Sequence, residues 1–203
     1  GSQRLRLPGE ASVEGDWSDA AVFLCAAAIA GEVTITGLNA ASVQGDRDIY
    51  GILKRFGANV SASDDGVTVS SAPLHGIEID AEQIPDLVPP IAAVAAAAEG
   101  ETRITGAARL RLKESDRLSA LYHLLRDLGG DAEELPDGLL IRGTKHLRGG
   151  SAAVRGDHRI AMAAALCSLL SDTPVTIDDP SCVSKSHPDF WTDFSALLKE
   201  AEA

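Results

Sequence analysis

Apolar stretches of helical length alternate along this chain with short runs of β-branched residues. The two longest apolar stretches, at 20–30 and 87–98, are rich in Ala and too short to span a bilayer. They predict helices that are buried on most sides in the core of a protein. The runs of β-branched residues are typical of strands, and they lie at 33–36, 102–105 and 175–177.

This pattern repeats at a period of about seventy residues, which predicts one structural unit present in three copies. We place the copies at approximately 11–71, 77–143 and 151–203. Each copy opens with a segment that ends on an aspartate able to cap the first turn of a helix; these are Asp16, Asp86 and Asp157. A second helix follows the strand in every copy, at about 46–56, 116–128 and 189–198.

A predicted hairpin closes each of the first two copies, because Asp-Gly between alternating runs is a strong hairpin signal. The two turns are at Asp65-Gly66 and Asp137-Gly138. A complete unit is therefore strand-helix-strand-helix-strand-strand, and the predicted fold class is α+β, built from α/β units. The third copy ends after its second helix, which leaves an open sheet edge that native folds usually cover. We therefore expect the chain to be part of something longer, with residues 3–7 as one candidate for covering that edge.

Composition limits the partners of the chain. Hydrophobic residues make up 45% of the sequence, aromatic residues only 4%, and the net charge is −12. Ala and Leu must therefore do most of the packing in the core. The negative charge argues against non-specific binding to nucleic acid or to an anionic membrane, although local basic residues can still bind an anionic substrate.

Cysteine usage favours a reducing compartment. Cys25, Cys167 and Cys182 form no CxxC pair, and the first two lie in Ala- and Leu-rich stretches, where they are interpreted as small buried apolar residues. Nothing suggests a disulfide framework, so a reducing cytoplasm fits best. No signal peptide is visible. Gly1 and Ser2 are interpreted as a cloning scar.

Three clusters of charged residues fall at matching places, just before or at the start of a predicted helix. They lie at 109–117, 156–159 and 184–189. Basic residues at a helix N-terminus have the wrong sign for the helix dipole, so Arg117, Arg159 and Lys185 call for an anionic partner. That partner could be a neighbouring Asp or Glu, but three clusters in equivalent places favour an anionic ligand.

The other polar residues have structural interpretations. Asp16 and Asp46 are predicted as plain N-caps, and the isolated His75, His123 and His146 as surface residues. No set of Cys, His and Asp has the spacing of a metal site. No phosphate-binding loop or dinucleotide fingerprint is present. We therefore do not expect a zinc or iron site.

At these clusters the chain resembles the family of 5-enolpyruvylshikimate-3-phosphate (EPSP) synthases. The resemblance is carried by Leu-Lys-Glu-Ser-Asp-Arg-Leu at 112–118, Gly-Asp-His-Arg-Ile-Ala-Met at 156–162 and Lys-Ser-His-Pro-Asp-Phe at 185–190. The segments 84–87 and 44–46 also fit. The match runs from about residue 8 to the end of the chain, with the motifs in the expected order and spacing.

The resemblance implies a fold of two domains, each with three of these units about a pseudo-threefold axis. Residues 3–203 then correspond to a single domain, the C-terminal one, whose third unit takes its closing hairpin from the N-terminus of the whole protein. The implied activity is transfer of the enolpyruvyl group of phosphoenolpyruvate to the 5-hydroxyl of shikimate 3-phosphate, with release of phosphate. The implied partners are these two substrates and the missing N-terminal domain, and the resemblance implies no metal or organic cofactor.

The family's roles carry over to individual residues. Asp86 corresponds to the carboxylate that binds the acceptor hydroxyls and takes the 5-hydroxyl proton, and Glu114 to the group that handles the proton at the methylene carbon. His158 is the third catalytic candidate, beside the reacting centre. The resemblance implies substrate binding by Lys113, Arg117, Arg159 and Lys185, the last three to phosphoenolpyruvate.

Two positions depart from the family pattern. Arg109 stands where some members have a substrate-binding Asn, and His187 stands where many have an aromatic residue, so neither is a predicted site residue. Other groups that the family needs lie outside this chain, so we expect no appreciable turnover from it alone. The alternatives are a related UDP-N-acetylglucosamine enolpyruvyl transferase and a non-catalytic ligand-binding or folding domain.

Overall fold

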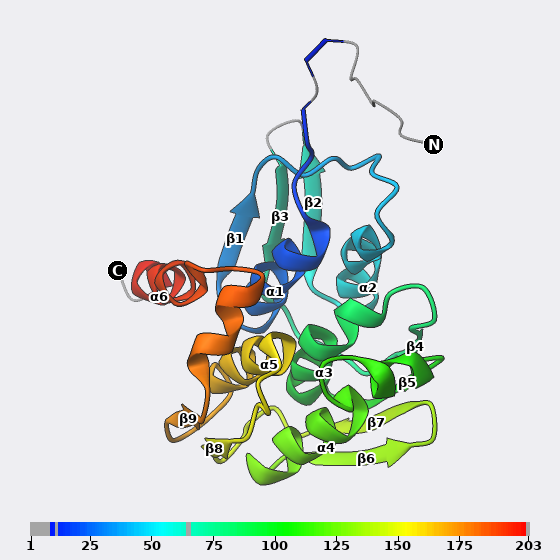
Figure 1. The fold of residues 1–203 in the computed structure, drawn as a ribbon, viewed down its shortest axis with the longest axis vertical. Helices are drawn as coiled ribbons and strands as arrows, with labels where there is room; N and C mark the ends of the chain where they lie inside the picture. The colour runs from blue at the N-terminus through cyan, green and yellow to red at the C-terminus, as the bar shows by residue number, and fades with distance from the viewer. Residues whose placement is uncertain (1–8, 11, 64–65, 202–203) are drawn as a thin grey trace, which may run out of the picture.

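The computed structural model describes residues 9–10, 12–63 and 66–201. Three groups of strands surround a central set of helices (Figure 1). None of the helices in this part of the chain is long and apolar enough to cross a membrane. The mixture of helices with parallel and antiparallel strand pairs confirms the predicted α+β class.

The middle segment of the chain contains every element of the predicted unit. In chain order these elements are β4 (Glu78–Asp80), α3 (Val88–Ala97), β5 (Gly100–Thr105), α4 (Arg117–Asp127), β6 (Asp131–Leu135) and β7 (Gly138–Gly143). The strands form one sheet in the order β4-β5-β7-β6. β4 and β5 are parallel, as the connection through a helix requires, and the other pairs are antiparallel.

The first segment contains a shorter version of this arrangement. Its elements are α1 (Trp17–Ile29), β1 (Glu32–Ile35), α2 (Ile49–Phe56), β2 (Asn59–Ser63) and β3 (Gly66–Ser70). The three strands are ordered β1-β3-β2, which is the order of β5, β7 and β6 in the middle segment. Residues 12–16, before α1, form no strand. Asp65 of the predicted first turn lies outside the described residues.

The last segment has β8 (Gly150–Ala152), α5 (His158–Ser168), β9 (Val175–Ile177) and α6 (Phe190–Ala201). β8 and β9 are parallel, as β4 and β5 are. Among the described residues, this pair forms a sheet of two strands.

The core lies where α1, α3 and α5 pack on one another in the middle of the molecule (Figure 1). Every residue from Val88 to Ala96 in α3 is buried, as expected for a helix that is apolar on all sides. The many Ala side chains let the three helix axes approach closely, because the side chains at the contact set the distance between helices. Cys25 and Cys167 are buried within α1 and α5, as predicted.

Two of the three predicted caps of the first helices are confirmed. Asp16 accepts hydrogen bonds from the backbone N–H groups of Ser18 and Asp19, and Asp157 accepts one from that of Arg159. The prediction for Asp86 is wrong. It lies in a 3₁₀ turn, Pro85–Leu87, and makes no cap hydrogen bond, because its carboxylate is bound to basic side chains elsewhere.

Helix ends and turns agree with the predictions to within a few residues. Gly57 follows α2 in the left-handed conformation, with φ of 106°. α2 begins later than predicted because a 3₁₀ turn, Gly45–Asp48, precedes it. The second hairpin turns one residue early, at Pro136-Asp137, and Gly138 is already paired with Leu135. A Cβ at Gly138 would lie 1.8 Å from the carbonyl oxygen of Ile104, so only glycine fits there.

Candidate active site

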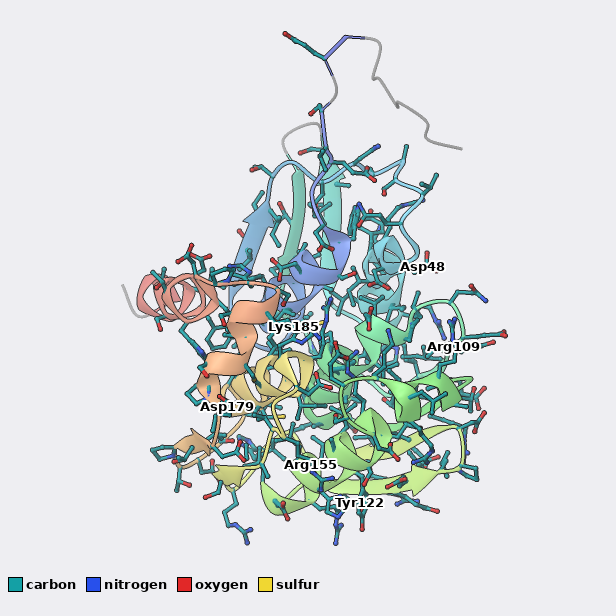
Figure 2. All side chains as sticks on the ribbon, viewed as in Figure 1. Asp48, Arg109, Tyr122, Arg155, Asp179 and Lys185 are labelled. Atoms are coloured by element: carbon teal, nitrogen blue, oxygen red, sulfur yellow. The ribbon has the colours of Figure 1, made fainter. Side chains whose placement is uncertain are left out.

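The starts of several helices converge on one cluster of charged side chains. Asp86 precedes α3, Glu114 precedes α4, Arg117 is the first residue of α4, and Asp157 precedes α5. Lys185 comes from a 3₁₀ turn, Pro180–Lys185, before α6. Lys185 is near the middle of the molecule, whereas Arg109 is towards the right edge in this view (Figure 2).

Arg117 is the centre of this cluster. Its side chain is only 2% exposed. Its Nε and Nη2 donate to the two oxygens of Asp157 at 2.8 and 3.2 Å, Nη2 also donates to Glu114 at 2.8 Å, and Nη1 donates to Asp86 at 2.8 Å. Of the two partners that the sequence allowed for Arg117, the structure shows neighbouring acids.

Asp157 anchors this ion pair and is fully buried. It also accepts hydrogen bonds from the Ser115 hydroxyl at 3.0 Å and from the backbone N–H of Arg159 at 3.0 Å. A buried carboxylate requires such complete pairing, because an unpaired buried charge is very costly. Sequence reasoning assigned Asp157 a helix cap alone and missed its pairing with Arg117. Its place inside the Gly-Asp-His-Arg motif is the signal that could have suggested a second role.

Asp86 is held between two cations. Lys113 Nζ lies 3.2 Å from Asp86 Oδ1, the same oxygen that Arg117 binds. Burial acts to raise the pKa of Asp86, but the Lys113 hydrogen bond and the charges of Arg159, Lys113 and Arg117 outweigh it and lower the pKa. Asp86 is therefore an ionised acceptor at neutral pH.

Glu114 is likewise held in its ionised form. Lys185 donates to Glu114 Oε1, and Arg117 binds Oε2 of the same carboxylate. The Lys185 hydrogen bond lowers the pKa of Glu114 to about 2, with a smaller contribution from the charge of Arg117. A group that must deliver a proton needs a higher pKa than this. Glu114 can do so only when its two cations are drawn away.

His158 lies beside these groups, with its Nδ1 at 3.9 Å from Oδ1 of Asp157. The residue is 6% exposed, and its Nδ1 makes no hydrogen bond to the described residues. Burial lowers the pKa of His158, and the positive charge of Arg159 acts in the same direction. The imidazole is therefore neutral at neutral pH and can hold or release one proton.

Arg159 differs from Arg117 in its pairing. It is 9% exposed, and its Nη1 donates to the backbone carbonyl of Ser18 at 2.9 Å. Among the described residues no carboxylate lies within 4 Å of its guanidinium. Because a guanidinium has five N–H donors, Arg159 keeps several of them for an external anion.

A polar pocket of about 430 Å³ adjoins Asp86. Its lining is formed by Ser18, Gln44, Gly45, Asp46, Gln83, Pro85, Asp86 and Arg109. Carboxylates, amides and a hydroxyl in one pocket suit a ligand with several hydroxyl groups. Arg109 also donates to the backbone carbonyl of Glu82.

Asp46 is another residue whose role sequence reasoning missed. The sequence predicts a plain N-cap, but Asp46 makes no cap hydrogen bond. Its carboxylate instead accepts a hydrogen bond from the Ser18 hydroxyl. Its position, at the start of the second helix of the first unit, is equivalent to that of the basic clusters and was the available signal. His75, His123 and His146 are exposed, as predicted. Within the described ranges, no group of three or more His, Cys, Asp and Glu residues could hold a metal ion.

The structure thus brings together all seven site residues that the sequence suggested. The contacts link Lys113 to Asp86, Arg117 to Asp86 and Glu114, and Lys185 to Glu114. His158 and Arg159 follow directly on Asp157, which binds Arg117. Four cations gathered in a chain of net charge −12 make this cluster a place where an anionic ligand can bind.

Comparisons with known proteins agree on one family. The sequence profile of EPSP synthase (3-phosphoshikimate 1-carboxyvinyltransferase) matches residues 1–194. A protein of Clostridium acetobutylicum named 3-phosphoshikimate 1-carboxyvinyltransferase is 47% identical over 185 residues, which are 91% of this chain and 43% of that protein. A protein of the same name from Methanocorpusculum labreanum is 42% identical over 93% of this chain and 44% of its own length.

A solved structure extends the agreement to the fold. The EPSP synthase of Acinetobacter baumannii superposes with a TM-score of 0.78 at 32% identity, over 91% of this chain and 46% of that one. The chain therefore spans less than half the length of each of these relatives. The motifs, the fold and these similarities together show that the chain belongs to the EPSP synthase family.

Proposed function

We propose that this chain carries one part of an active site that transfers the enolpyruvyl group of phosphoenolpyruvate to the 5-hydroxyl of shikimate 3-phosphate. The observation that carries the proposal is the convergence of Lys113, Arg117, Arg159 and Lys185 on Asp86 and Glu114. In this set the four cations can bind two anionic substrates, and the two carboxylates can transfer protons. The names of the relatives support the same reaction.

Phosphoenolpyruvate has a carboxylate and a phosphate, and we assign both to the cationic side of the cluster. Arg159 is the first ligand, because its guanidinium has no carboxylate partner within 4 Å among the described residues. Bidentate guanidinium geometry suits both anionic groups. Lys185 and Arg117 are the further ligands, and binding to them draws positive charge away from Glu114.

This exchange gives Glu114 its catalytic protonation state. With Lys185 on the carboxylate, the pKa of Glu114 is about 2 and no proton is available. Transfer of that hydrogen bond to the substrate raises the pKa of Glu114, and the carboxyl group can then carry a proton. Glu114 donates this proton to the methylene carbon of phosphoenolpyruvate in the addition step and recovers one from the resulting methyl group in the elimination step.

Asp86 serves the acceptor. Its carboxylate binds the acceptor hydroxyls in the adjoining polar pocket and takes the 5-hydroxyl proton as the oxygen bonds to C2 of phosphoenolpyruvate. The C–O bond to phosphate then breaks, and phosphate leaves with its bonding electrons. His158, neutral beside Arg159, is assigned to proton movement near the same centre. Each such acid or base group typically contributes about 10²–10⁴-fold to the rate.

Turnover requires more than this chain. We propose that 3–203 form one domain of the enzyme, that Gly1 and Ser2 are a cloning scar and that the protein works in the cytoplasm. Relatives of the same name are more than twice as long. Substrate groups that this chain does not contact would be bound by the remaining half, and closure of the two halves would exclude water. By itself the chain is a weak ligand-binding domain.

The test is phosphate release from phosphoenolpyruvate plus shikimate 3-phosphate. The chain is assayed alone and mixed with the N-terminal half of the Clostridium acetobutylicum relative. We expect activity only in the mixture, and less of it when the chain carries Glu114→Gln. Turnover by the chain alone would refute the split of the active site, and activity with UDP-N-acetylglucosamine as acceptor would point to the related transferase instead.

A further inference from the structure

Ser18 is a junction between three polar groups at the start of α1. Its backbone N–H donates to the capping carboxylate of Asp16 at 2.8 Å. Its hydroxyl donates to Oδ2 of Asp46, and its backbone carbonyl accepts the hydrogen bond from Arg159 at 2.9 Å. Each hydrogen-bonding part of Ser18 therefore has a different partner, and one of these partners is the Arg159 guanidinium.

Asp46 fixes this junction from the other side. It belongs to the 3₁₀ turn Gly45–Asp48, in which its carboxylate makes no cap hydrogen bond. Burial raises the pKa of Asp46, and the hydrogen bond from Ser18 opposes that effect. The charge of Asp86 also raises the pKa of Asp46, whereas the charge of Arg159 lowers it, so Asp46 and Arg159 attract each other without being in direct contact.

This arrangement holds the Arg159 side chain but leaves most of its N–H donors unpaired with carboxylates of the described residues. A direct carboxylate partner, such as the three that surround Arg117, would compete with an incoming anion for the guanidinium. A backbone carbonyl uses one N–H donor and leaves the others to the ligand. Asp46 binds the Ser18 hydroxyl and also attracts the Arg159 guanidinium electrostatically, without a direct contact to it.

We infer that Ser18 and Asp46 are positioning residues that hold the Arg159 guanidinium ready for an anionic ligand. The inference rests on the proposed function for the identity of that ligand, phosphoenolpyruvate. Neither residue needs to touch the reacting atoms. They act on Arg159 through the hydrogen bond between its guanidinium and the Ser18 carbonyl.

Binding of phosphoenolpyruvate to Ser18→Ala and Asp46→Ala variants tests the inference by the sign of the change. Removing a negative charge beside an anion site by itself tightens anion binding. We instead expect Asp46→Ala to weaken binding by roughly tenfold, because the hold on Arg159 is lost. Ser18→Ala should weaken it similarly, Ser18→Thr should restore it, and the double variant should be no worse than either single one.

Asp48→Ala is the matched control. It removes the same charge from the same 3₁₀ turn, where Asp48 is exposed and makes no side-chain hydrogen bond to the described residues. It should leave binding unchanged or slightly tighter. Tighter binding by Asp46→Ala as well would overturn the inference.

A second measurement needs no ligand and separates this inference from the proposed function. In nitrogen-15 NMR spectra of the ligand-free chain, the Arg159 side-chain signals should show a restricted guanidinium. In Asp46→Ala the same signals should show a mobile guanidinium. The same mobility in both chains would refute the positioning role, whereas restricted signals in a chain that does not bind phosphoenolpyruvate would refute the proposed ligand alone.

Discussion

Arg117 and Asp157 form a two-point ion pair that is almost completely removed from water. Nε and Nη2 of the arginine lie 2.8 and 3.2 Å from the two carboxylate oxygens, and the two side chains are 2% and 0% exposed. Forming such a pair adds little net stability, because both charges must be desolvated. Breaking the pair is costly, because the charge that remains is buried away from water.

Asp157→Asn should therefore destabilise the fold strongly. It removes the buried one of the three carboxylates around the Arg117 guanidinium, and we expect a loss of about 3–5 kcal/mol in the free energy of unfolding. Urea unfolding followed by circular dichroism measures this loss. The control is Asp131→Asn, which removes an exposed partner of Arg126 at 3.5 Å and should cost less than about 1 kcal/mol. Equal losses in the two variants would contradict the assignment.

The hydrogen bond between Lys185 and Glu114 predicts a measurable change in acidity. Glu114 has a pKa of about 2 in the folded chain against an ordinary value of 4.5, so its contribution to stability is present above pH 4.5 and is lost as the pH falls towards 2. In Lys185→Gln the pKa of Glu114 should rise towards 4.5, and stability should change less across this range. Carbon-13 NMR titration of the Glu114 carboxyl group measures the shift directly. An unchanged titration curve would show that Arg117 alone holds the carboxylate.

Local signals made most of the fold predictable. The element order follows from the alternation of Ala-rich and β-branched stretches, and the caps at Asp16 and Asp157 follow from an aspartate placed before an apolar helix. The turn at Pro136-Asp137 was displaced by one residue because a tertiary contact decides it. Gly138 must lie within the strand, where the carbonyl of Ile104 leaves no room for a side chain.

The residues of the candidate site were predictable to the extent that they lie in recognisable motifs. Arg117, Arg159 and Lys185 stood out because a cation at a helix N-terminus has the wrong sign for the dipole. The bond between Ser18 and Asp46 could not be found in this way, because it joins residues 28 positions apart whose approach depends on how α1 packs. The same holds for Asp86, where a pattern typical of a cap was overruled by Arg117, 31 residues further on.

His187 should make the stability of the C-terminal helix depend on pH. Its ring nitrogens lie 2.8 Å from Asp19 on α1 and 2.8 Å from Asp193 on α6. Burial acts to lower the pKa of His187, but the hydrogen bond to Asp193 and the charge of Asp19 outweigh it and raise the pKa above 6.5. For a raised pKa, the stabilisation is fully present below pH 6.5 and is lost as the pH rises through the folded-state value.

Unfolding in urea at pH 6 and pH 8.5 measures this effect. The parent chain should lose more stability between the two values than His187→Phe, which keeps the ring contacts with Phe23 and Phe190 but cannot titrate. His123→Phe is the control, because His123 is exposed and, in the part of the chain that the structure describes, its hydrogen bonds stay within α4. The same pH dependence in the parent chain and in His187→Phe would rule out His187 as its source.

Substitutions at Arg159 and Arg117 should separate ligand binding from folding. Arg159→Ala removes one hydrogen bond to a backbone carbonyl and should lower the free energy of unfolding by only about 1 kcal/mol. Its affinity for phosphoenolpyruvate should fall by roughly ten- to a hundredfold, as expected for the loss of a charged ligand group. Arg117→Ala instead strips a cation from three carboxylates and should cost about 3–5 kcal/mol in stability before any effect on binding is counted. Urea unfolding and calorimetric titration of the same preparations measure both quantities, and a folded Arg159→Ala chain with unchanged affinity would remove Arg159 from the binding site.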